Sequence, residues 1–227
     1  MSDEVQISAS ILNADFARLG DEVERAVAGG VDSIHLDVMD GHFVDNITFG
    51  PPVVGALRPH ATGLPFHSHL MISNPLAYID AFAEAGSDLI VAHVEADDEP
   101  NAVIDAIRAA GRAPGLSLNP DTPVDDITPY LDRIELLLVM TVHPGWGGQP
   151  FRRDVLPKMA WLRDEIERRG LDLPIGVDGG VNEETIGAAR AAGGRVLVVG
   201  SGLYRHPGDL GPVVEDLRRA ALAEEDC

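Results

Sequence analysis

Short runs of Val, Ile and Leu alternate along the chain with longer segments in which apolar and polar residues mix. The runs are only a few residues long and rich in β-branched residues, which is typical of strands buried on both faces. Runs of this kind predict eight strands, at residues 5–11, 33–38, 64–71, 89–93, 114–118, 136–142, 174–177 and 196–199.

The segments between these strands carry the signals that begin and end helices. In 74–87, Asn74 is placed to cap a helix, Pro75 fits its first helical position, and Gly86 ends it. Further helices are predicted at 122–131, which opens with Thr122 and Pro123, at 154–170, the longest, at 182–194, which opens with Asn182 and closes with Gly193 and Gly194, and at about 212–224.

Regular alternation of strands and helices predicts an α/β protein with a parallel sheet covered by helices. Eight such units within 227 residues favour a closed (β/α)₈ barrel, with an open doubly wound sheet as the alternative. No linker or change in composition divides the sequence. We therefore expect residues 1–227 to form a single domain.

The composition excludes several classes of partner. The formal net charge is −20, from 37 acidic and 17 basic residues, and Lys158 is the only lysine. Such a surface is a poor partner for nucleic acid, because binding to phosphates requires basic groups. No apolar run approaches the ~20 residues that span a bilayer. The acidic N-terminus does not resemble a secretory signal, and the single cysteine, Cys227, cannot form an intrachain disulfide. We expect a cytoplasmic protein.

Histidine and aspartate residues interrupt apolar strands close to their carboxyl ends, where barrel enzymes place their active sites. His35 and Asp37 alternate on the second strand, His69 is on the third, and Asp178 follows the seventh. Two imidazoles and two carboxylates are typical ligands of Zn²⁺, Fe²⁺, Mn²⁺ or Co²⁺. Each of these residues alone could be a hydrogen-bonded interior group, but the four together favour a metal site. Other polar residues at strand ends are Ser10, His93, Asn119, His143, Gly200 and Ser201.

Three glycine-rich loops indicate an anion site. VDGGVN (177–182) and VVGSGLY (198–204) follow the last two strands, and HPGWGGQPF (143–151) follows the sixth. Loops after the last two strands of a barrel commonly bind phosphate through backbone N–H groups and helix N-termini. None of the three loops contains a lysine, so backbone groups would have to attract an anion to this acidic protein.

Met39, Met71 and Met140 also lie near strand ends. Methionine is a common filler of irregular core space, and this explanation is preferred for any one of them. The alternative is that together they form an apolar lid that keeps water out of the metal pocket.

Six segments together resemble the ribulose-phosphate 3-epimerase family. They are ISASILNADFARLG (7–20), HLDVMDGHFVDNITFGPPVV (35–54), HLMISNP (69–75), GLSLNPDTPV (115–124), VMTVHPGWGGQPF (139–151) and VDGGVN (177–182). They follow the family's order over essentially the whole chain. The resemblance implies a single (β/α)₈ TIM barrel with one divalent metal ion (Zn, Fe, Mn or Co), a small sugar-phosphate substrate, and a homo-oligomer that is a dimer or a hexamer.

The resemblance also implies roles for individual residues. The metal would be bound by His35, Asp37, His69 and Asp178, and Asp37 and Asp178 would be the catalytic acid–base pair. Substrate contacts are implied at Ser10, His69, Gly145, Trp146, Gly147, Gly148, Gly179, Gly180, Gly200 and Ser201, and a cap over the enediolate at Met39, Met71 and Met140.

The implied reaction interconverts D-ribulose 5-phosphate and D-xylulose 5-phosphate by two-base proton transfer through a metal-stabilised enediolate. The alternatives are a D-allulose-6-phosphate 3-epimerase, a metal-dependent TIM-barrel hydrolase and a non-catalytic sugar-phosphate binder. The hydrolase is disfavoured because its His-x-Asp motif usually stands on the first strand, and because Lys158 is expected in a helix remote from the strand ends. The chain departs from the family pattern at Asp45, His67, His143, Trp146, Gly176 and Gly202. Since His143 and Gly202 flank the substrate loops, they keep the allulose alternative open.

Overall fold

The computed structural model describes residues 5–223 of the chain. Cys227, and residue 224 at the predicted end of the last helix, lie outside the described residues. Within the described part, the element order is the regular strand–helix alternation expected from the sequence.

All eight predicted strands are present, and they close into one parallel barrel in which each strand pairs with its sequence neighbours and β8 pairs with β1. The closed barrel is therefore confirmed and the open sheet is wrong. The strands are β1 (Gln6–Ser10), β2 (Ser33–Met39), β3 (Phe66–Met71), β4 (Leu89–His93), β5 (Ala113–Leu118), β6 (Leu136–Met140), β7 (Ile175–Asp178) and β8 (Gly194–Val199).

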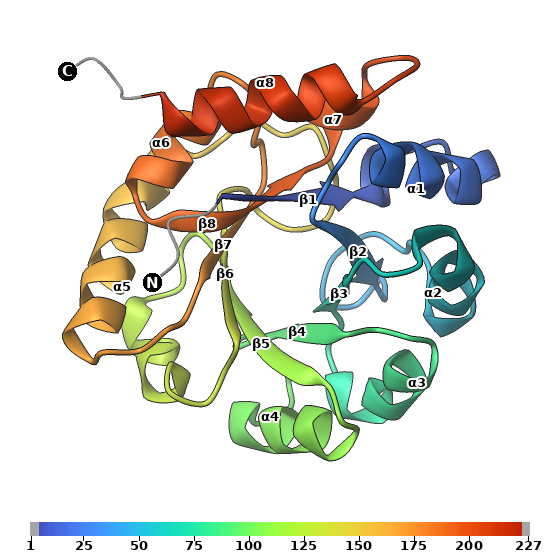
Figure 1. Ribbon diagram of the computed structural model, residues 1–227. Coiled ribbons are helices and arrows are strands. Elements are labelled where there is room, and N and C mark those ends of the chain that lie inside the picture. Colours follow the sequence, from blue (N-terminus) through green and yellow to red (C-terminus); the bar gives the residue numbers. More distant parts are fainter. Residues whose placement is uncertain (1–4, 224–227) are drawn as a thin grey trace.

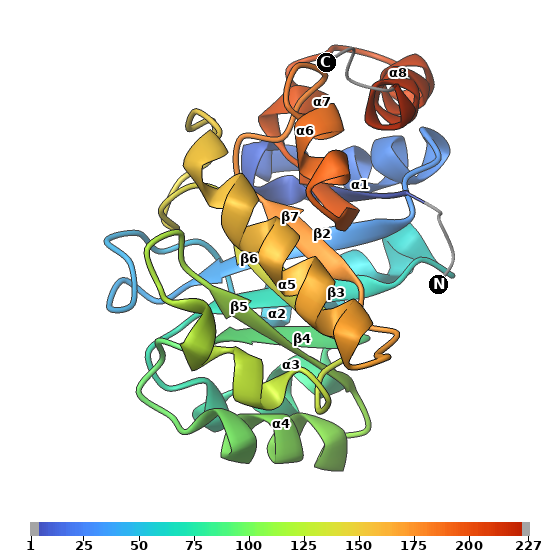
Figure 2. The same ribbon diagram turned by 90° about the vertical axis from the view of Figure 1, so that its left-hand side faces the viewer.

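Helices surround the barrel on the outside (Figures 1 and 2). They are α1 (Leu19–Ala28), α2 (Pro51–Leu57), α3 (Ile79–Glu84), α4 (Pro100–Ala109), α5 (Leu156–Arg168), α6 (Ile186–Ala191), α7 (Ser201–Tyr204) and α8 (Gly211–Leu222). As predicted, the longest is the helix that follows β6. None of the helices within residues 5–223 has the length and apolar character needed to cross a bilayer.

Two segments predicted as helices form 3₁₀ turns over part or all of their length. The segment predicted at 122–131 forms only the 3₁₀ turns η5 (Val124–Asp126) and η6 (Thr128–Tyr130). An α-helix there would contain Pro129, which has no N–H to donate and would clash with the preceding turn. The segment predicted at 74–87 forms a 3₁₀ turn, η4 (Pro75–Ala77), before α3, and the Asn74 side chain does not cap it.

The helix predicted from Asn182 begins four residues later, at α6. The Asn182 side chain accepts a hydrogen bond from the Glu184 N–H, 2.9 Å away, and so forms a turn in place of a helical cap. The helix also ends at Ala191, before the predicted end at Gly193 and Gly194. Gly193 takes the positive φ of 111° that glycine adopts most readily, and β8 begins at Gly194.

Along each strand, alternate residues face two different interiors: the apolar core beneath the helices and the inside of the barrel. On β2, Ile34, Leu36 and Val38 belong to the apolar core between barrel and helices. The residues between them face the inside of the barrel, and two of these, His35 and Asp37, are buried polar groups. The barrel interior therefore carries the chemistry, while the layer beneath the helices carries the apolar packing.

The loops that follow β2 and β6 extend from the same end of the barrel, on the left in Figure 2. In a parallel barrel all strands end on this side, so residues at the ends of β1, β2, β3, β7 and β8 are brought together there. This is the end at which the sequence concentrates its polar residues.

Asp32 fastens the opposite, amino-terminal edge of the barrel. Its Oδ2 accepts hydrogen bonds from the Ile7 N–H at 2.6 Å and from Arg218 of α8 at 2.8 Å. Arg218 also donates to the Val5 carbonyl at 2.9 Å. One carboxylate thus joins β1, β2 and α8 where the barrel closes.

We expect Asp32→Ala to lower the free energy of unfolding by about 1–3 kcal/mol, because the Ile7 N–H and Arg218 lose their acceptor. Urea unfolding of this variant and of Asp125→Ala, which removes an exposed carboxylate, measures the difference. Equal stability of the two variants would contradict the role given to Asp32.

Candidate metal centre and active site

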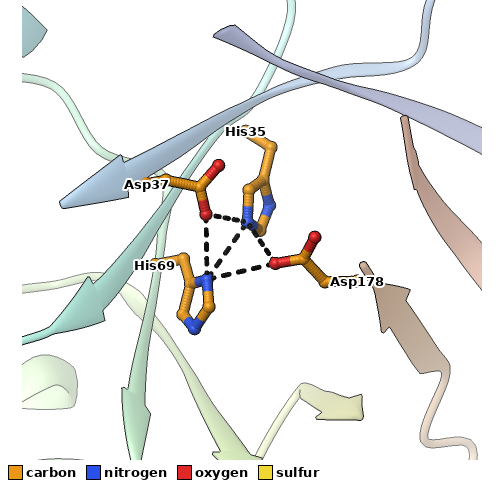
Figure 3. A group of neighbouring side chains, drawn as sticks. All are labelled: His35, Asp37, His69 and Asp178. Atoms are coloured by element: carbon orange, nitrogen blue, oxygen red, sulfur yellow. Dashed lines mark hydrogen bonds and ion pairs between the residues drawn. The ribbon is translucent and has the colours of Figure 1, made fainter. Parts of the chain in front are cut away.

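Four side chains meet inside the carboxyl end of the barrel (Figure 3). They are His35 and Asp37 of β2, His69 of β3 and Asp178 of β7, and their donor atoms all lie within 4.8 Å of one another. The sequence reasoning had placed these four residues at one site, and the structure brings them together.

One nitrogen of each histidine faces the two carboxylates. Asp37 Oδ1 lies 3.3 Å from His35 Nε2 and 3.1 Å from His69 Nδ1. Asp178 Oδ2 lies 3.6 Å and 3.4 Å from the same two nitrogens. The nitrogens themselves are 3.4 Å apart. Two nitrogen and two oxygen atoms therefore surround one small volume.

Ser10, at the end of β1, orients one of these carboxylates. Its hydroxyl donates to Asp37 Oδ2 at 2.6 Å, so the two oxygens of Asp37 have different tasks. Oδ2 is held by Ser10, while Oδ1 faces the histidines. A carboxylate fixed in this way can present the same oxygen to a ligand at every encounter.

The two carboxylates of the cluster require positive charge to balance them. Burial by itself would lower the pKa of His35, but the charge of Asp37 and hydrogen bonds to Asp178 and Asp37 raise it to about 10. Burial likewise opposes the charged form of Asp37, yet His35 and His69 hold its pKa well below the ordinary range. In the protein alone, protons on the imidazoles balance the carboxylates.

A divalent cation fits this donor set. It would replace the protons as the balancing charge, and unprotonated imidazole nitrogens with carboxylate oxygens are ligands of Zn²⁺, Fe²⁺, Mn²⁺ and Co²⁺. His35, Asp37, His69 and Asp178 thus form a cluster able to hold a metal ion.

A small cavity of about 50 Å³ opens from the cluster to solvent. Most of the predicted substrate residues line it, as do the two aspartates. His35 and His69 do not, because they are almost completely buried below it. The predicted residues in its wall are Ser10, Asp37, Met39, Met71, Met140, Gly145, Trp146, Gly147, Gly148, Asp178, Gly179, Gly180, Gly200 and Ser201.

The glycines after β7 are required by close packing against the β6 loop. Gly179 and Gly180 have positive φ angles of 120° and 67°. A Cβ on Gly180 would lie 2.6 Å from the Phe151 nitrogen, and one on Gly179 would lie 2.5 Å from the Val142 side chain. Only glycine lets these backbones approach so closely, which leaves bare amide groups along the cavity.

The three methionines form an apolar part of the cavity wall. Met39 and Met71 are register partners on β2 and β3 and pack with Val44. Met140 belongs to a second apolar cluster on the β6 side of the barrel. All three are at most 3% exposed, so each fills the core and borders the cavity at the same time.

Two polar residues of the cavity wall were missed by the sequence reasoning. Asn13 lies between the loops after β6 and β8, so close that a Cβ on Gly147 or Gly200 would collide with its amide. Gln149 donates to the carbonyls of His143 and Trp146, at 2.7 and 2.9 Å, and holds the β6 loop in shape. Both residues lie within the segments that resemble the family, and this position was the signal that could have identified them.

The departures from the family pattern lie mostly outside the cavity. His143 lines a separate surface hollow with Asp45, and Gly202 faces the Val181 carbonyl. His67, the β3 register partner of His35, is buried, and burial together with the charge of His35 lowers its pKa to about 4. Among these departures only Trp146 borders the cavity, so the substitutions at His143 and Gly202 do not alter its wall.

Lys158 was expected far from the strand ends, and this expectation was wrong. Its ammonium group donates to the carbonyls of Asn119, Pro120 and Thr122 in the loop that follows β5. The N-terminal turn of α5 lies beside that loop, which brings residue 158 to the carboxyl end of the barrel. Because its ammonium is engaged by backbone carbonyls, Lys158 belongs to the scaffold.

Comparison with known proteins agrees with this geometry. Residues 6–204 match the ribulose-phosphate 3 epimerase family. The ribulose-phosphate 3-epimerase of Bacillus subtilis (strain 168) is 48% identical over 88% of this chain and 92% of its own length. That of Rhodobacter capsulatus is 46% identical over 88% and 86%. The crystal structure of 3-keto-L-gulonate-6-phosphate decarboxylase from Vibrio cholerae shares the fold, with a TM-score of 0.71 over 96% of this chain and 97% of that chain at 16% identity.

The charge balance predicts pH-dependent metal binding. The pKa of His35 is about 10, so in the metal-free protein its imidazole is protonated near neutral pH, and a bound ion must displace that proton. Affinity for Mn²⁺ should therefore rise with pH, by about tenfold per pH unit for each proton displaced. Calorimetric titration with Mn²⁺ between about pH 6 and pH 8, below that pKa, measures this. An affinity independent of pH would contradict the proposed balance.

Proposed function

The chain belongs to the ribulose-phosphate 3-epimerase family, and from its site we propose that it interconverts D-ribulose 5-phosphate and D-xylulose 5-phosphate with the aid of one divalent metal ion. The observation that carries the proposal is the convergence of Asp37 and Asp178, from β2 and β7, on the same donor cluster as His35 and His69. Family membership favours an epimerase over the hydrolase and the non-catalytic binder.

Epimerisation at carbon 3 removes a proton next to a carbonyl group and returns one from the opposite face. The obstacle is the negative charge that develops on oxygen 2 of the resulting enediolate. A divalent ion held by the four ligands would supply Lewis-acid stabilisation of that charge. The side chains must then supply two proton carriers, one on each side of the sugar.

Asp37 and Asp178 fit these two tasks. They enter the site from strands separated by β1 and β8, so they reach the cavity from different parts of its wall. Burial and the charge of Asp37 raise the pKa of Asp178, but hydrogen bonds to His35 and His69 outweigh them and lower it overall. The lowered pKa values keep both carboxylates ionised at neutral pH in the protein alone, so the one that acts as the acid must first take up a proton. In the working enzyme one aspartate is protonated whenever the other is not, which gives a bell-shaped pH dependence.

The glycine loops would bind the phosphate. A protein with a formal charge of −20 repels a sugar phosphate at long range. Amide groups near Gly147, Gly180 and Gly200 offer short-range positive potential without adding a lysine. His69, Ser10 and Ser201 would complete the contacts with the sugar, and the three methionines would exclude water from the enediolate.

We expect Asp178→Asn to reduce kcat by about 10²–10⁴-fold, because one of the two proton carriers is lost. Binding of a non-reacting phosphate ester, measured by calorimetry, should persist. Steady-state assays with metal content checked in each sample test this, with Asp172→Asn as the control, since Asp172 is exposed and lies at the far end of β7. Retention of most activity by Asp178→Asn would overturn the assignment.

The substrate is tested by assaying ribulose 5-phosphate and allulose 6-phosphate side by side in D₂O. An epimerase incorporates deuterium at carbon 3 as it turns over, whereas a hydrolase releases product and a binder does neither. We expect label to enter the five-carbon sugar at the higher kcat/KM. A preference for allulose 6-phosphate would replace the proposed substrate while leaving the chemistry unchanged.

A further inference from the structure

Behind His69 lie the buried His93 and the half-buried Glu95, two polar groups that the proposed reaction does not use. His69 Nε2, the nitrogen turned away from the metal ligands, lies 2.8 Å from Nε2 of His93 at the end of β4. His93 Nδ1 lies 3.0 Å from Glu95 Oε2. The two rings meet edge to edge, because their centroids are 5.0 Å apart while the facing nitrogens are much closer. A continuous line of contacts therefore leads from the metal ligands to Glu95.

Glu95 acts in this line as an acceptor. Its Oε1 accepts hydrogen bonds from the Asn119 N–H, at 2.7 Å, and from the Thr122 hydroxyl. Burial opposes its charge, but hydrogen bonding to His93 leads the effects that lower its pKa. An ionised carboxylate has no proton to give, so His93 must donate to it.

The negative charge on Glu95 determines which ring nitrogens of His93 and His69 carry protons. His93 carries its proton on Nδ1, facing Glu95, and its Nε2 is left as an acceptor. His69 must then donate from Nε2, so the neutral form of His69, the form that can bind a metal ion, has an unprotonated Nδ1. That Nδ1 is the atom that faces Asp37 and Asp178 at 3.1 and 3.4 Å.

We propose that His93 and Glu95 are positioning residues that hold His69 in the tautomer able to bind the metal ion. The inference rests on the metal site of the proposed function and adds to it two residues outside the ligand set. A ligating imidazole commonly donates its other N–H to such a partner, which fixes the ring and increases the basicity of the ligating nitrogen.

The network is anchored by the only lysine of the chain. Lys158 Nζ donates to the carbonyls of Asn119 and Thr122, the residues that donate to Glu95, at 3.2 and 2.6 Å. On the other side, the Phe43 ring packs against His93, with centroids 4.7 Å apart. Both contacts restrict the movement of groups that must keep their hydrogen bonds.

Glu95→Gln is the sharpest variant, because it keeps the size of the side chain and reverses one hydrogen bond. The Asn119 N–H still needs an acceptor, so the amide oxygen of glutamine takes the place of Oε1 and its NH₂ faces His93. His93 then accepts at Nδ1 and carries its proton on Nε2. His69 Nε2 becomes an acceptor, and a proton on Nδ1 now opposes the metal.

Metal affinity is the first measurement. We expect Glu95→Gln to bind Mn²⁺ about 10–100-fold more weakly than the unmodified protein in a calorimetric titration. The matched control is Glu99→Gln, which changes a carboxylate that caps α4 in the same loop region and does not contact His93. This control should bind Mn²⁺ within about twofold of the unmodified protein, a difference far below the one expected for Glu95.

The second measurement reads the proton positions directly. In nitrogen-15 NMR of histidine-labelled, zinc-loaded protein, His93 should carry its proton on Nδ1, and in Glu95→Gln on Nε2. The unmodified protein alone tests this, so the result does not depend on how the variant folds. A merely structural contact would leave the tautomer of His93 unchanged by the substitution.

The outcomes separate the two proposals. If the unmodified protein binds Mn²⁺ and Glu95→Gln binds it equally well, the positioning role is overturned and the metal site stands. The positioning role is also overturned if His93 of the unmodified protein carries its proton on Nε2. If the unmodified protein binds no divalent ion at His35, Asp37, His69 and Asp178, the metal site falls and the positioning role falls with it.

Discussion

The enclosure of two carboxylates, Asp37 and Asp178, within a few ångströms of each other is the constraint on which the site depends. Buried like charges are stable only if positive charge lies between them. His35 and His69 can supply it as protonated imidazoles, or they can release their protons to a divalent ion. The barrel makes this arrangement possible because its hydrogen-bonded framework and apolar outer layer hold strands β2, β3 and β7 in place.

The same constraint explains the surroundings of the cluster. Two of the ligands have a further partner outside the set: Ser10 holds Asp37, and His93 with Glu95 holds His69. Such partners reduce the orientations that a ligand can adopt, so less entropy is lost when an ion or a sugar binds. The acidic surface has a matching consequence, because an anionic substrate must be bound through short-range contacts with backbone amides.

Local sequence rules succeeded where one interaction dominates and failed where several compete. The strands were found because uninterrupted β-branched runs have few other stable arrangements in a parallel barrel. The segment 122–131 was misjudged because capping signals at Thr122 were weighed above Pro129, which prevents a continuous helix. Lys158 was placed in its helix correctly, but only the packing of α5 against the β5 loop determines where its ammonium group ends.

The sequence by itself determined the α/β alternation, the eight strands and the identity of the four ligand candidates, since hydrophobic period and residue chemistry are local properties. The tertiary structure decided the rest. Barrel closure between β1 and β8 determined that side chains far apart in the chain share one small volume. It also decided which nitrogen of His69 faces the ligands and which faces His93. The position of the proton on His69 depends on its partner on the neighbouring strand, and no pattern along the chain identifies that partner.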